Sequence, residues 1–493
     1  MTKSKVFLIV LVSAATFLLV YTPHFAYPFP SHIDEWHHIT EAIKLQEGEY
    51  SGGTMGYRVG FHLLLLLLSK ITNLVLIYQF LPAIWAVFSA LALFYVVYNK
   101  TNKQFYIAFL AVIFFASIKS NVNITGLWFF TPLTFSIPFI FLYVYFFTEG
   151  IEKQNKKFIL ASLAIIITLL FVHSISVLFA IPFLLIYSLF NFTLLNGAKG
   201  NLTGFKYIKK EWKFFSLFLI IPIIGILFYK FMTKVPWESL VRNLVQELQF
   251  RRGWGVLEID NSPFELYSLI GYILAIIGLV FIFRSKKNIK KYLAYGLWPI
   301  TVLILITIYR KTGVSYLSSY QRNLYYFVIG LPILSALGLN YLFKFTPLNL
   351  LRNYLTGLTK KKTLVVMVFI IVIFFTFKSY WEIPKQVDLY QVIDNDDYQA
   401  LLFLSTLPKT VVMADPMVSV AMYPISQQEP VATLFFYGNR ENAKMFFLLD
   451  GCKAKQQILN KYNVKYVLSK SQIDCGWDLI YDKKNYIYQY EKE

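Results

Sequence analysis

The sequence comprises 493 residues, of which 57% are hydrophobic and only 15% are charged, and it carries a formal net charge of +20. A soluble globular protein of this composition would lack the polar surface needed to cover its core, so the composition excludes that class and indicates a membrane protein. A basic excess of this size also occurs in nucleic-acid-binding proteins, but the positions of the charges along the chain make that interpretation unnecessary.

Apolar segments long enough to cross about 30 Å of hydrocarbon recur along the first 380 residues, separated by short polar or lysine-rich connectors. Residues 6–20 have the length of a signal-peptide core, but no small-residue cleavage site follows them, so we interpret them as part of a retained span. We predict about eleven transmembrane helices, near residues 6–22, 73–98, 105–118, 129–148, 158–172, 175–193, 214–232, 265–283, 293–309, 323–343 and 364–380.

The hydrophobic pattern changes near residue 381. Residues 381–493 alternate apolar runs of strand length with charged turns that contain Gly or Pro, which is typical of a small soluble α/β domain. The predicted fold is therefore a polytopic α-helical transmembrane domain, residues 1–380, which includes a first outer loop at 23–58, followed by a small extracytoplasmic α/β domain, residues 381–493.

The basic residues predict the orientation of the spans. With a cytoplasmic N-terminus, the lysine-rich connectors all fall on the inner side, as the positive-inside rule requires, and anionic inner-leaflet lipid accounts for most of the net charge. The inner clusters are Lys100 and Lys103; Lys153, Lys156 and Lys157; Lys199, Lys206, Lys209, Lys210 and Lys213; Arg284, Lys286, Lys287, Lys290 and Lys291; and Arg352, Lys360, Lys361 and Lys362. The protein is then a multi-pass cell-membrane protein whose C-terminal domain lies outside. Cys452 and Cys475 lie there too, where they either form a disulfide or remain two thiols.

The first outer loop is the acidic part of this basic protein. Its apolar residues Trp36, Ile39 and Ile43 recur with a helical period, and Gly48 is a natural stop, so we predict a short amphipathic helix at the membrane surface. Polar residues of the loop include Asp34, Glu35, Glu41, Glu47, Glu49, His24, His32, His37 and His38.

Asp34, His38 and Glu41 have the spacing i, i+4, i+7 and would share one face of this helix. One interpretation is the solvated face of an interfacial helix. The other is a functional site, because ionisable groups held at the lipid boundary are costly and tend to be functional. A metal site is a third alternative, but nothing completes a ligand set around His38 and Glu41, so we expect no metal or other cofactor and do not favour a divalent ion.

Arginines in the outer loops depart from the positive-inside trend. They contact lipid headgroups or a carboxylate, or they bind a lipid phosphate, whose oxygens a guanidinium can hold in bidentate geometry. We expect the second role, for Arg58, Arg251, Arg252, Arg310 and Arg322.

Three motifs carry a family resemblance. The first loop contains Asp34-Glu35-Trp36-His37 followed by Gly48-Glu49-Tyr50, the tenth span begins after Tyr320-Gln321-Arg322 and continues through small residues at 330–339, and the tail contains Ala414-Asp415-Pro416. Together and in this order, these motifs resemble the C-type (GT-C) superfamily of membrane glycosyltransferases over the whole chain. The resemblance is greatest to the branch of protein O-mannosyltransferases and lipid A aminoarabinose transferases.

The resemblance implies an inverting transfer of a sugar from a dolichyl- or undecaprenyl-phosphate donor to a lipid, glycan or protein acceptor at the outer face. It implies Asp34 as the base that takes the acceptor proton, Glu35 as a loop-orienting or acceptor-binding residue, and His37, His38 and Glu41 as acceptor-binding or orienting residues. No nucleic-acid partner is implied.

The sequence departs from the family in two places. The Pro-Pro pair that often follows the first loop in this branch is replaced by Gly56-Tyr57-Arg58. The Trp-Trp-Asp-Tyr-Gly signature of oligosaccharyltransferases is absent, which argues against transfer of whole glycans to Asn. A polymerase or ligase of lipid-linked glycans and a non-enzymatic transporter remain alternatives, although a transporter usually shows charges within its spans and paired repeats.

Overall fold

The computed structural model describes residues 2–50, 58–121, 126–195, 212–233, 236–251, 263–345, 391–434 and 437–491, together with residues 370, 373, 374 and 377. The chain forms two compact units. The first comprises residues 1–22, 54–61 and 81–384, and the second comprises residues 23–53, 62–80 and 385–493. The first outer loop is therefore grouped with the C-terminal residues, whereas the boundary at residues 380–381 rests on the sequence alone and stays a prediction.

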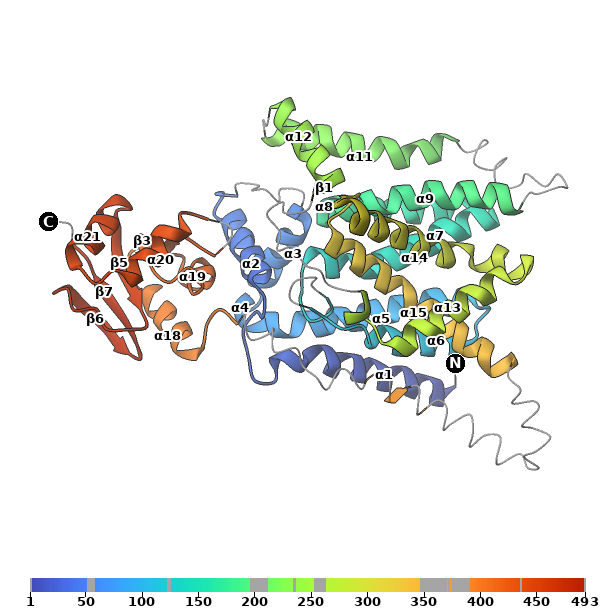
Figure 1. Ribbon diagram of the computed structural model, residues 1–493, viewed down its shortest axis with the longest axis horizontal. Coiled ribbons are helices and arrows are strands. Elements are labelled where there is room, and N and C mark those ends of the chain that lie inside the picture. Colours follow the sequence, from blue (N-terminus) through green and yellow to red (C-terminus); the bar gives the residue numbers. More distant parts are fainter. Residues whose placement is uncertain are drawn as a thin grey trace. The chain divides into compact units, whose positions relative to one another are not determined.

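The first unit consists mainly of apolar helices that pack side by side (Figure 1). Long apolar segments adopt this form in lipid because a helix satisfies every backbone hydrogen bond within the segment. The helices are α1 (Lys3–Tyr21), α5 (Leu81–Lys100), α6 (Phe105–Ala116), α7 (Pro132–Lys153), α8 (Lys156–Val172), α9 (Ser174–Leu195), α11 (Trp212–Thr233), α12 (Trp237–Leu248), α13 (Leu269–Phe283), α14 (Lys286–Thr312) and α15 (Tyr320–Phe345).

Five helical segments in the described ranges are long and apolar enough to cross a membrane: Lys3–His24, Leu74–Lys100, Pro132–Lys153, Lys286–Thr312 and Tyr320–Phe343. Each coincides with a predicted span. Three more predicted spans are occupied by shorter helices: α6 with 12 residues, α8 with 17 and α13 with 15. Helices α9 and α11 occupy another two, and most of 364–380 lies outside the described residues. The structure supports a mostly helical membrane protein, and the total of about eleven spans stays a prediction.

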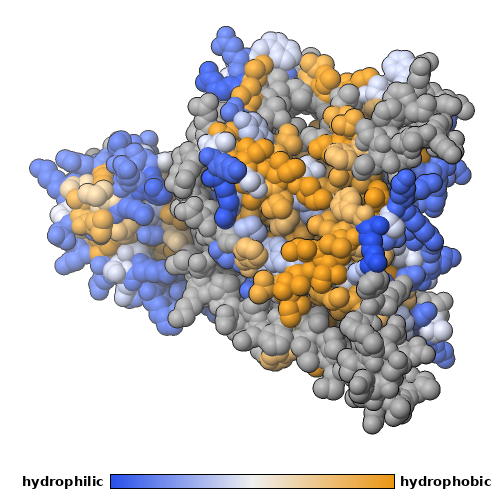
Figure 2. All heavy atoms as spheres, turned by 45° about the vertical axis from the view of Figure 1, so that its right-hand side comes forward, coloured by the Kyte–Doolittle hydropathy of each residue, from blue (hydrophilic) through white to orange (hydrophobic). Residues whose placement is uncertain are grey.

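The surface of the first unit is also that of a membrane protein. Figure 2 shows hydrophobic side chains gathered over a broad area of the helices, with hydrophilic side chains at its borders. Large apolar side chains exposed on several helices include Phe7, Phe88, Ile224, Ile276 and Ile304. An apolar surface of this extent is unfavourable in water and favourable against lipid tails.

Two glycines allow α13 and α15 to cross closely. Gly278 of α13 lies directly against the backbone carbonyl of Leu334, and Gly338 of α15 lies against the carbonyl of Leu274. A Cβ atom at either glycine would collide with these backbone oxygens. Small residues at such crossings let helices approach in lipid, where packing rather than water exclusion drives their association.

A buried ionic cluster joins α5, α7 and α9. The Lys100 ammonium, on a side chain only 4% exposed, lies 2.7 Å from a carboxylate oxygen of Glu149 and 2.7 Å from one of Glu152. The Tyr187 hydroxyl donates a hydrogen bond to Glu152 at 3.2 Å. The Lys153 ammonium lies 2.6 Å from the other carboxylate oxygen of Glu149, but the Lys153 side chain is exposed. Lys100 is thus the buried cation that two carboxylates share.

The second unit contains a five-stranded sheet in the order β4-β3-β5-β7-β6. Strand β3 pairs in parallel with β4 and β5, whereas β7 pairs antiparallel with β5 and β6. Its elements include β3 (Val411–Met413), β4 (Glu429–Pro430), β5 (Val464–Ser469), β6 (Asp478–Lys483), β7 (Asn485–Gln489), α18 (Asn395–Leu404), α19 (Ser419–Ser426), α20 (Arg440–Leu448) and α21 (Cys452–Lys461). Met413, Phe446, Leu459 and Val467 are among its core residues. The small C-terminal sheet that the sequence predicts is present, with helices beside it.

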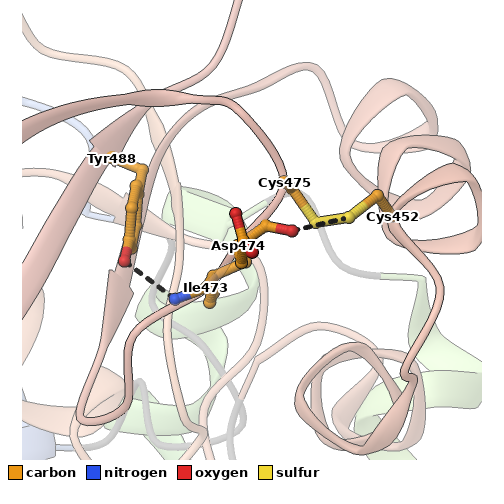
Figure 3. The surroundings of a disulfide bond; sticks show 5 residues. All are labelled: Cys452, Ile473, Asp474, Cys475 and Tyr488. Atoms are coloured by element: carbon orange, nitrogen blue, oxygen red, sulfur yellow. Dashed lines mark hydrogen bonds between the residues drawn. A yellow bond between two sulfur atoms is a disulfide. The ribbon is translucent and has the colours of Figure 1, made fainter.

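A disulfide fastens α21 to the loop between β5 and β6. Cys452 and Cys475 are joined, with their Cα atoms 5.4 Å apart (Figure 3). The same loop is held to β7, because the backbone N–H of Ile473 donates to the hydroxyl of Tyr488 at 2.8 Å. Of the two states that the sequence left open for these cysteines, the structure has the bridge. Such a bridge typically stabilises a small domain by about 2–4 kcal/mol.

Candidate functional site

The first-loop helix is α2 (Ile33–Gln46), and its start is fixed by a reciprocal cap. His32 is the N-cap residue, and its Nδ1 accepts the backbone N–H of Asp34 at 3.1 Å. One oxygen of the Glu35 carboxylate accepts the backbone N–H groups of Ser31 and His32, at 2.8 and 3.0 Å. These bonds satisfy backbone N–H groups that would otherwise have no acceptor at the start of the helix. Glu35 is fully buried, and its contacts are those of a loop-orienting residue.

Asp34 is the accessible carboxylate of the first turn, with 37% of its side chain exposed. Its Oδ2 lies 3.9 Å from Nδ1 of His32. Because that nitrogen accepts a backbone N–H, it carries no proton, so this contact is not a charged hydrogen bond. A carboxylate is electrostatically favoured at a helix N-terminus. Asp34 therefore combines access to solvent with a position at the N-terminus of α2, and a proton acceptor must be accessible to its substrate.

A buried chain of polar groups follows on the next turns of α2. Nδ1 of His38 lies 3.0 Å from Nε2 of His62, and Nδ1 of His62 lies 3.1 Å from the hydroxyl of Tyr50. His62 belongs to α3 (Val59–Ser69). Both rings are buried. In each of these two hydrogen bonds one atom donates a proton and the other accepts it. With neutral rings the bonds run in a single direction, from His38 to Tyr50 or the reverse.

Glu41, one turn further, is also buried. Burial raises its pKa, and the charge of Lys44 offsets part of that rise. Because α2 is continuous from residue 33 to 46, Asp34, His38 and Glu41 lie on one side of the helix, as their spacing predicted. The alternative of a solvated face is wrong at His38 and Glu41, which are covered. The ring of His37 is half-buried and lies 5.7 Å from that of His38.

A second polar cluster lies in the helical unit, at the junction of α8 and α9. Nδ1 of His173 lies 2.7 Å from Oγ of Ser176, and that hydroxyl lies 3.0 Å from Oγ of Ser136 and 2.9 Å from the hydroxyl of Tyr326. All four residues are buried. Ser136 donates its own proton to the carbonyl of Leu133, and Ser176 donates to Ser136. Ser176 thus accepts from Tyr326 and from His173, which leaves Nε2 of a neutral His173 as a hydrogen-bond acceptor.

Two of the predicted phosphate-binding arginines belong to this cluster. Arg58 precedes α3, Arg322 lies in the first turn of α15, and both act electrostatically on His173 and on Tyr326. Arg322 is half-buried, and within the described ranges it forms no ion pair with a carboxylate. Two guanidinium groups thus act electrostatically on one hydrogen-bonded polar core. This arrangement suits a phosphate group.

The remaining three arginines have other surroundings. Nε of Arg310 donates to the hydroxyl of Tyr320 at 2.9 Å, and its guanidinium lies over that ring. Arg251 lies in β1 (Gln249–Arg251), which pairs antiparallel with β2 (Val314–Tyr316) and so joins the two outer loops that carry these cations. Arg252 lies outside the described residues. Arg310 is therefore engaged by an aromatic residue, whereas Arg322 forms no ion pair with a carboxylate in the described part of the chain.

The sequence interpretation did not assign roles to Tyr50, His62, His173, Ser176 and Tyr326. His62 and His173 carried a signal, because each is a polar residue within an apolar segment, where ionisable groups are costly. The serine and tyrosine partners carried none. Among the residues that the structure describes, no group of three or more His, Cys, Asp or Glu side chains is placed to hold a metal ion.

The sequence matches no family model and no curated protein. The fold, in contrast, matches solved structures. The oligosaccharyltransferase of Archaeoglobus fulgidus in its apo form has a TM-score of 0.63 at 13% identity, over 94% of this chain and 69% of that one. The same archaeal enzyme, AglB, in complex with an inhibitory peptide and a dolichol-phosphate has a TM-score of 0.60 at 14% identity, over 95% and 69%.

ArnT from Cupriavidus metallidurans in the apo state has a TM-score of 0.59 at 10% identity, over 97% of both chains. AglB and ArnT are GT-C glycosyltransferases, and this chain shares their fold. The fold-level resemblance predicted from the three sequence motifs is confirmed.

Proposed function

We propose that this protein is an integral-membrane glycosyltransferase that moves a sugar from a polyprenyl-phosphate donor to a lipid, glycan or protein acceptor at the outer face of the membrane. The observation that carries the proposal is the shared fold, which extends over 97% of both this chain and ArnT. A dolichol-phosphate bound to AglB further supports a lipid-phosphate donor for this fold.

On the donor side, the proposal assigns the phosphate to Arg58 and Arg322. When the bond between the anomeric carbon and the phosphate oxygen breaks, negative charge develops on the leaving polyprenyl phosphate. Fixed cations stabilise that charge more in the transition state than in the ground state, which is the condition for catalysis. Ser176 holds His173 and Tyr326 in place, as their hydrogen bonds support, and these two side chains keep the arginine surroundings polar and neutral.

On the acceptor side, the proposal assigns the base to Asp34. The acceptor oxygen forms a bond to the anomeric carbon from the face opposite the phosphate, the proton of its hydroxyl passes to the Asp34 carboxylate, and configuration inverts. General-base assistance of this kind contributes about 10²–10⁴-fold. The exposure of Asp34 supports this role, and the occupied carboxylate of Glu35 argues for the orienting role of that residue.

Transfer of a preassembled glycan is the second candidate. The TM-score of 0.63 with the archaeal oligosaccharyltransferase favours it. Against it stand the missing Trp-Trp-Asp-Tyr-Gly signature and the smaller share of that chain, 69%, that is covered. Transfer assays with lipid donors that carry either one sugar or a longer glycan distinguish these two candidates. A lipid-linked product that grows by repeats would instead indicate a polymerase.

Arg322→Ala is expected to raise the KM for the lipid donor by about 10- to 100-fold, because one charge-assisted interaction with phosphate, worth about 1.5–3 kcal/mol, is lost. Lys311→Ala is the matched control, since Lys311 is an exposed cation that precedes the same span. Steady-state kinetics with a polyprenyl-phosphate sugar measure both variants. Equal KM values for the two variants would indicate that Arg322 only anchors the loop at the membrane.

The proposed topology places the donor, the first loop and the C-terminal domain outside. A reporter fused after Glu493 is expected to be extracytoplasmic, and one inserted near Lys287 is expected to be cytoplasmic, as the lysine clusters predict. Alkaline phosphatase and green fluorescent protein fusions report the two sides. The opposite location of either reporter would contradict the assignment of the outer loops.

A further inference from the structure

The C-terminal end of α2 is held by hydrogen bonds and ion pairs to the α/β domain. The hydroxyl of Tyr423, in α19, donates to a carboxylate oxygen of Glu47 at 2.5 Å, and the Lys409 ammonium lies 3.1 Å from the same oxygen. Partial burial pushes the pKa of Glu47 upward, but the bonds from Tyr423 and Lys409 and the charges of Lys409 and Lys44 outweigh it and hold the pKa below its usual range. Glu47 is therefore charged at neutral pH.

A second ion pair lies one turn earlier. The Lys44 ammonium is 3.7 Å from a carboxylate oxygen of Glu429, in β4, and it lies over the ring of Tyr423, 4.6 Å from its centroid. Tyr423 therefore contacts both charged residues of the α2 end, one through its hydroxyl and one through its ring. We call these five residues, Lys44, Glu47, Lys409, Tyr423 and Glu429, the α2 clamp.

The segment before α2 is attached to the same domain. Phe29 is buried, and its ring lies 5.0 Å from the ring of Tyr398, in α18. Helix α19 packs along α2. An isolated helix of 14 residues is only marginally stable in water, so these contacts, and not intrinsic propensity, must hold α2 straight.

We propose that the C-terminal domain acts as a positioning element for the first-loop helix, and that the α2 clamp sets the orientation of Asp34. This inference rests on the proposed function, which makes Asp34 the base. The domain's role is then to hold a catalytic helix at its far end, and the clamp residues are positioning residues that do not touch substrate.

Helix geometry gives the size of the effect. Asp34 and Glu47 are separated by 13 residues, so a helix places them about 20 Å apart along its axis. A tilt of about 10° at the clamp then moves Asp34 by about 3 Å, whereas a misplacement of about 1 Å can cost about 10²-fold in rate. A small loosening of the clamp therefore lowers kcat while the donor site, built from other residues, keeps its KM.

Tyr423→Phe and Lys409→Met test the clamp in the full-length protein in lipid nanodiscs. Two matched controls come from the same domain. Tyr462→Phe removes a hydroxyl that accepts from the Asn442 side chain, 2.6 Å away, and Lys484→Met removes the partner of Asp396, 3.0 Å away. Hydrogen exchange of residues 33–46 is measured without substrate, and kcat and KM are measured with a polyprenyl-phosphate sugar.

For Tyr423→Phe we expect exchange in α2 to accelerate about tenfold, consistent with loss of one hydrogen bond to a charged group. We expect kcat to fall about tenfold or more and the donor KM to stay within about twofold. Both controls are expected to match the wild type. Lys44→Glu and Glu429→Lys should each lower kcat, and the double variant should recover most of it, because the ion pair is restored with its signs exchanged.

Unchanged α2 exchange in the clamp variants, or accelerated exchange with unchanged kcat, would overturn the proposal. A donor KM that rises as much as kcat falls would also overturn it, because that pattern indicates a general loss of structure. A third outcome is that exchange in α2 accelerates in the clamp variants but neither the wild type nor any variant transfers sugar. This outcome would support the clamp and overturn only the proposed function.

Discussion

Asp34→Asn is expected to lower sugar transfer by about 10²–10⁴-fold, with expression, thermal stability and donor KM close to those of the wild type. Asn keeps the size and most hydrogen bonds of Asp but cannot accept the proton, so the variant removes base catalysis without opening a cavity. The Asp34 side chain is partly exposed and forms no short ion pair in the described part of the chain. Structural side effects are therefore expected to be small.

Glu35→Gln is the matched comparison. A single oxygen of Glu35 accepts both backbone N–H groups, and the amide oxygen of Gln can do the same. The variant keeps these two bonds but loses the interaction of a negative charge with the helix N-terminus, about 0.3–1 kcal/mol, so it should cost less activity than Asp34→Asn. An inactive Glu35→Gln with an active Asp34→Asn would exchange the two roles. Full activity of both would move the search for the base to outer-loop Glu238, Glu247, Glu258 and Asp260.

Lys100→Met is expected to lower the free energy of unfolding by about 3–5 kcal/mol, because Glu149 and Glu152 lose the buried cation that both contact. Met conserves the length and apolar volume of the side chain, so the loss of charge is isolated. Lys153→Met is the control. Lys153 pairs with the carboxylate of Glu149 but is itself exposed, and exposed pairs are worth about 0–1 kcal/mol. Thermal unfolding in one detergent measures both, and equal losses for the two variants would contradict the account.

Local patterns in the sequence predicted α2 well. Helical periodicity of Trp36 and Ile39 placed the helix, and both side chains are buried. Gly48 ends the segment with a positive φ of 75°, a conformation that glycine adopts without a steric cost. The strand-length runs after residue 381 likewise predicted the α/β domain. These features depend on neighbouring residues, so they are visible in the chain itself.

Contacts between distant segments were not predictable in this way. Lys100 counts as an inner connector charge in the sequence, but packing of α5 against α7 buries it between two carboxylates. His38 meets His62 only because α3 packs near α2, and Lys44 meets Glu429 through a domain that begins more than 300 residues later. Neither spacing nor hydropathy encodes such pairings, which is why the interfacial-helix alternative stayed open until the burial of His38 and Glu41 was known.

Transfer of radiolabel from a defined lipid donor tests the central claim most directly. Membranes containing the wild type or Asp34→Asn are incubated with a panel of radiolabelled polyprenyl-phosphate sugars, and the label is followed into lipid, glycan and protein fractions. The account predicts that at least one label leaves its donor and becomes covalently bound to an acceptor with the wild type, and that Asp34→Asn reduces this transfer at least about 100-fold. Label that stays on every donor in wild-type membranes, or that crosses the membrane without forming a new covalent bond, would contradict it.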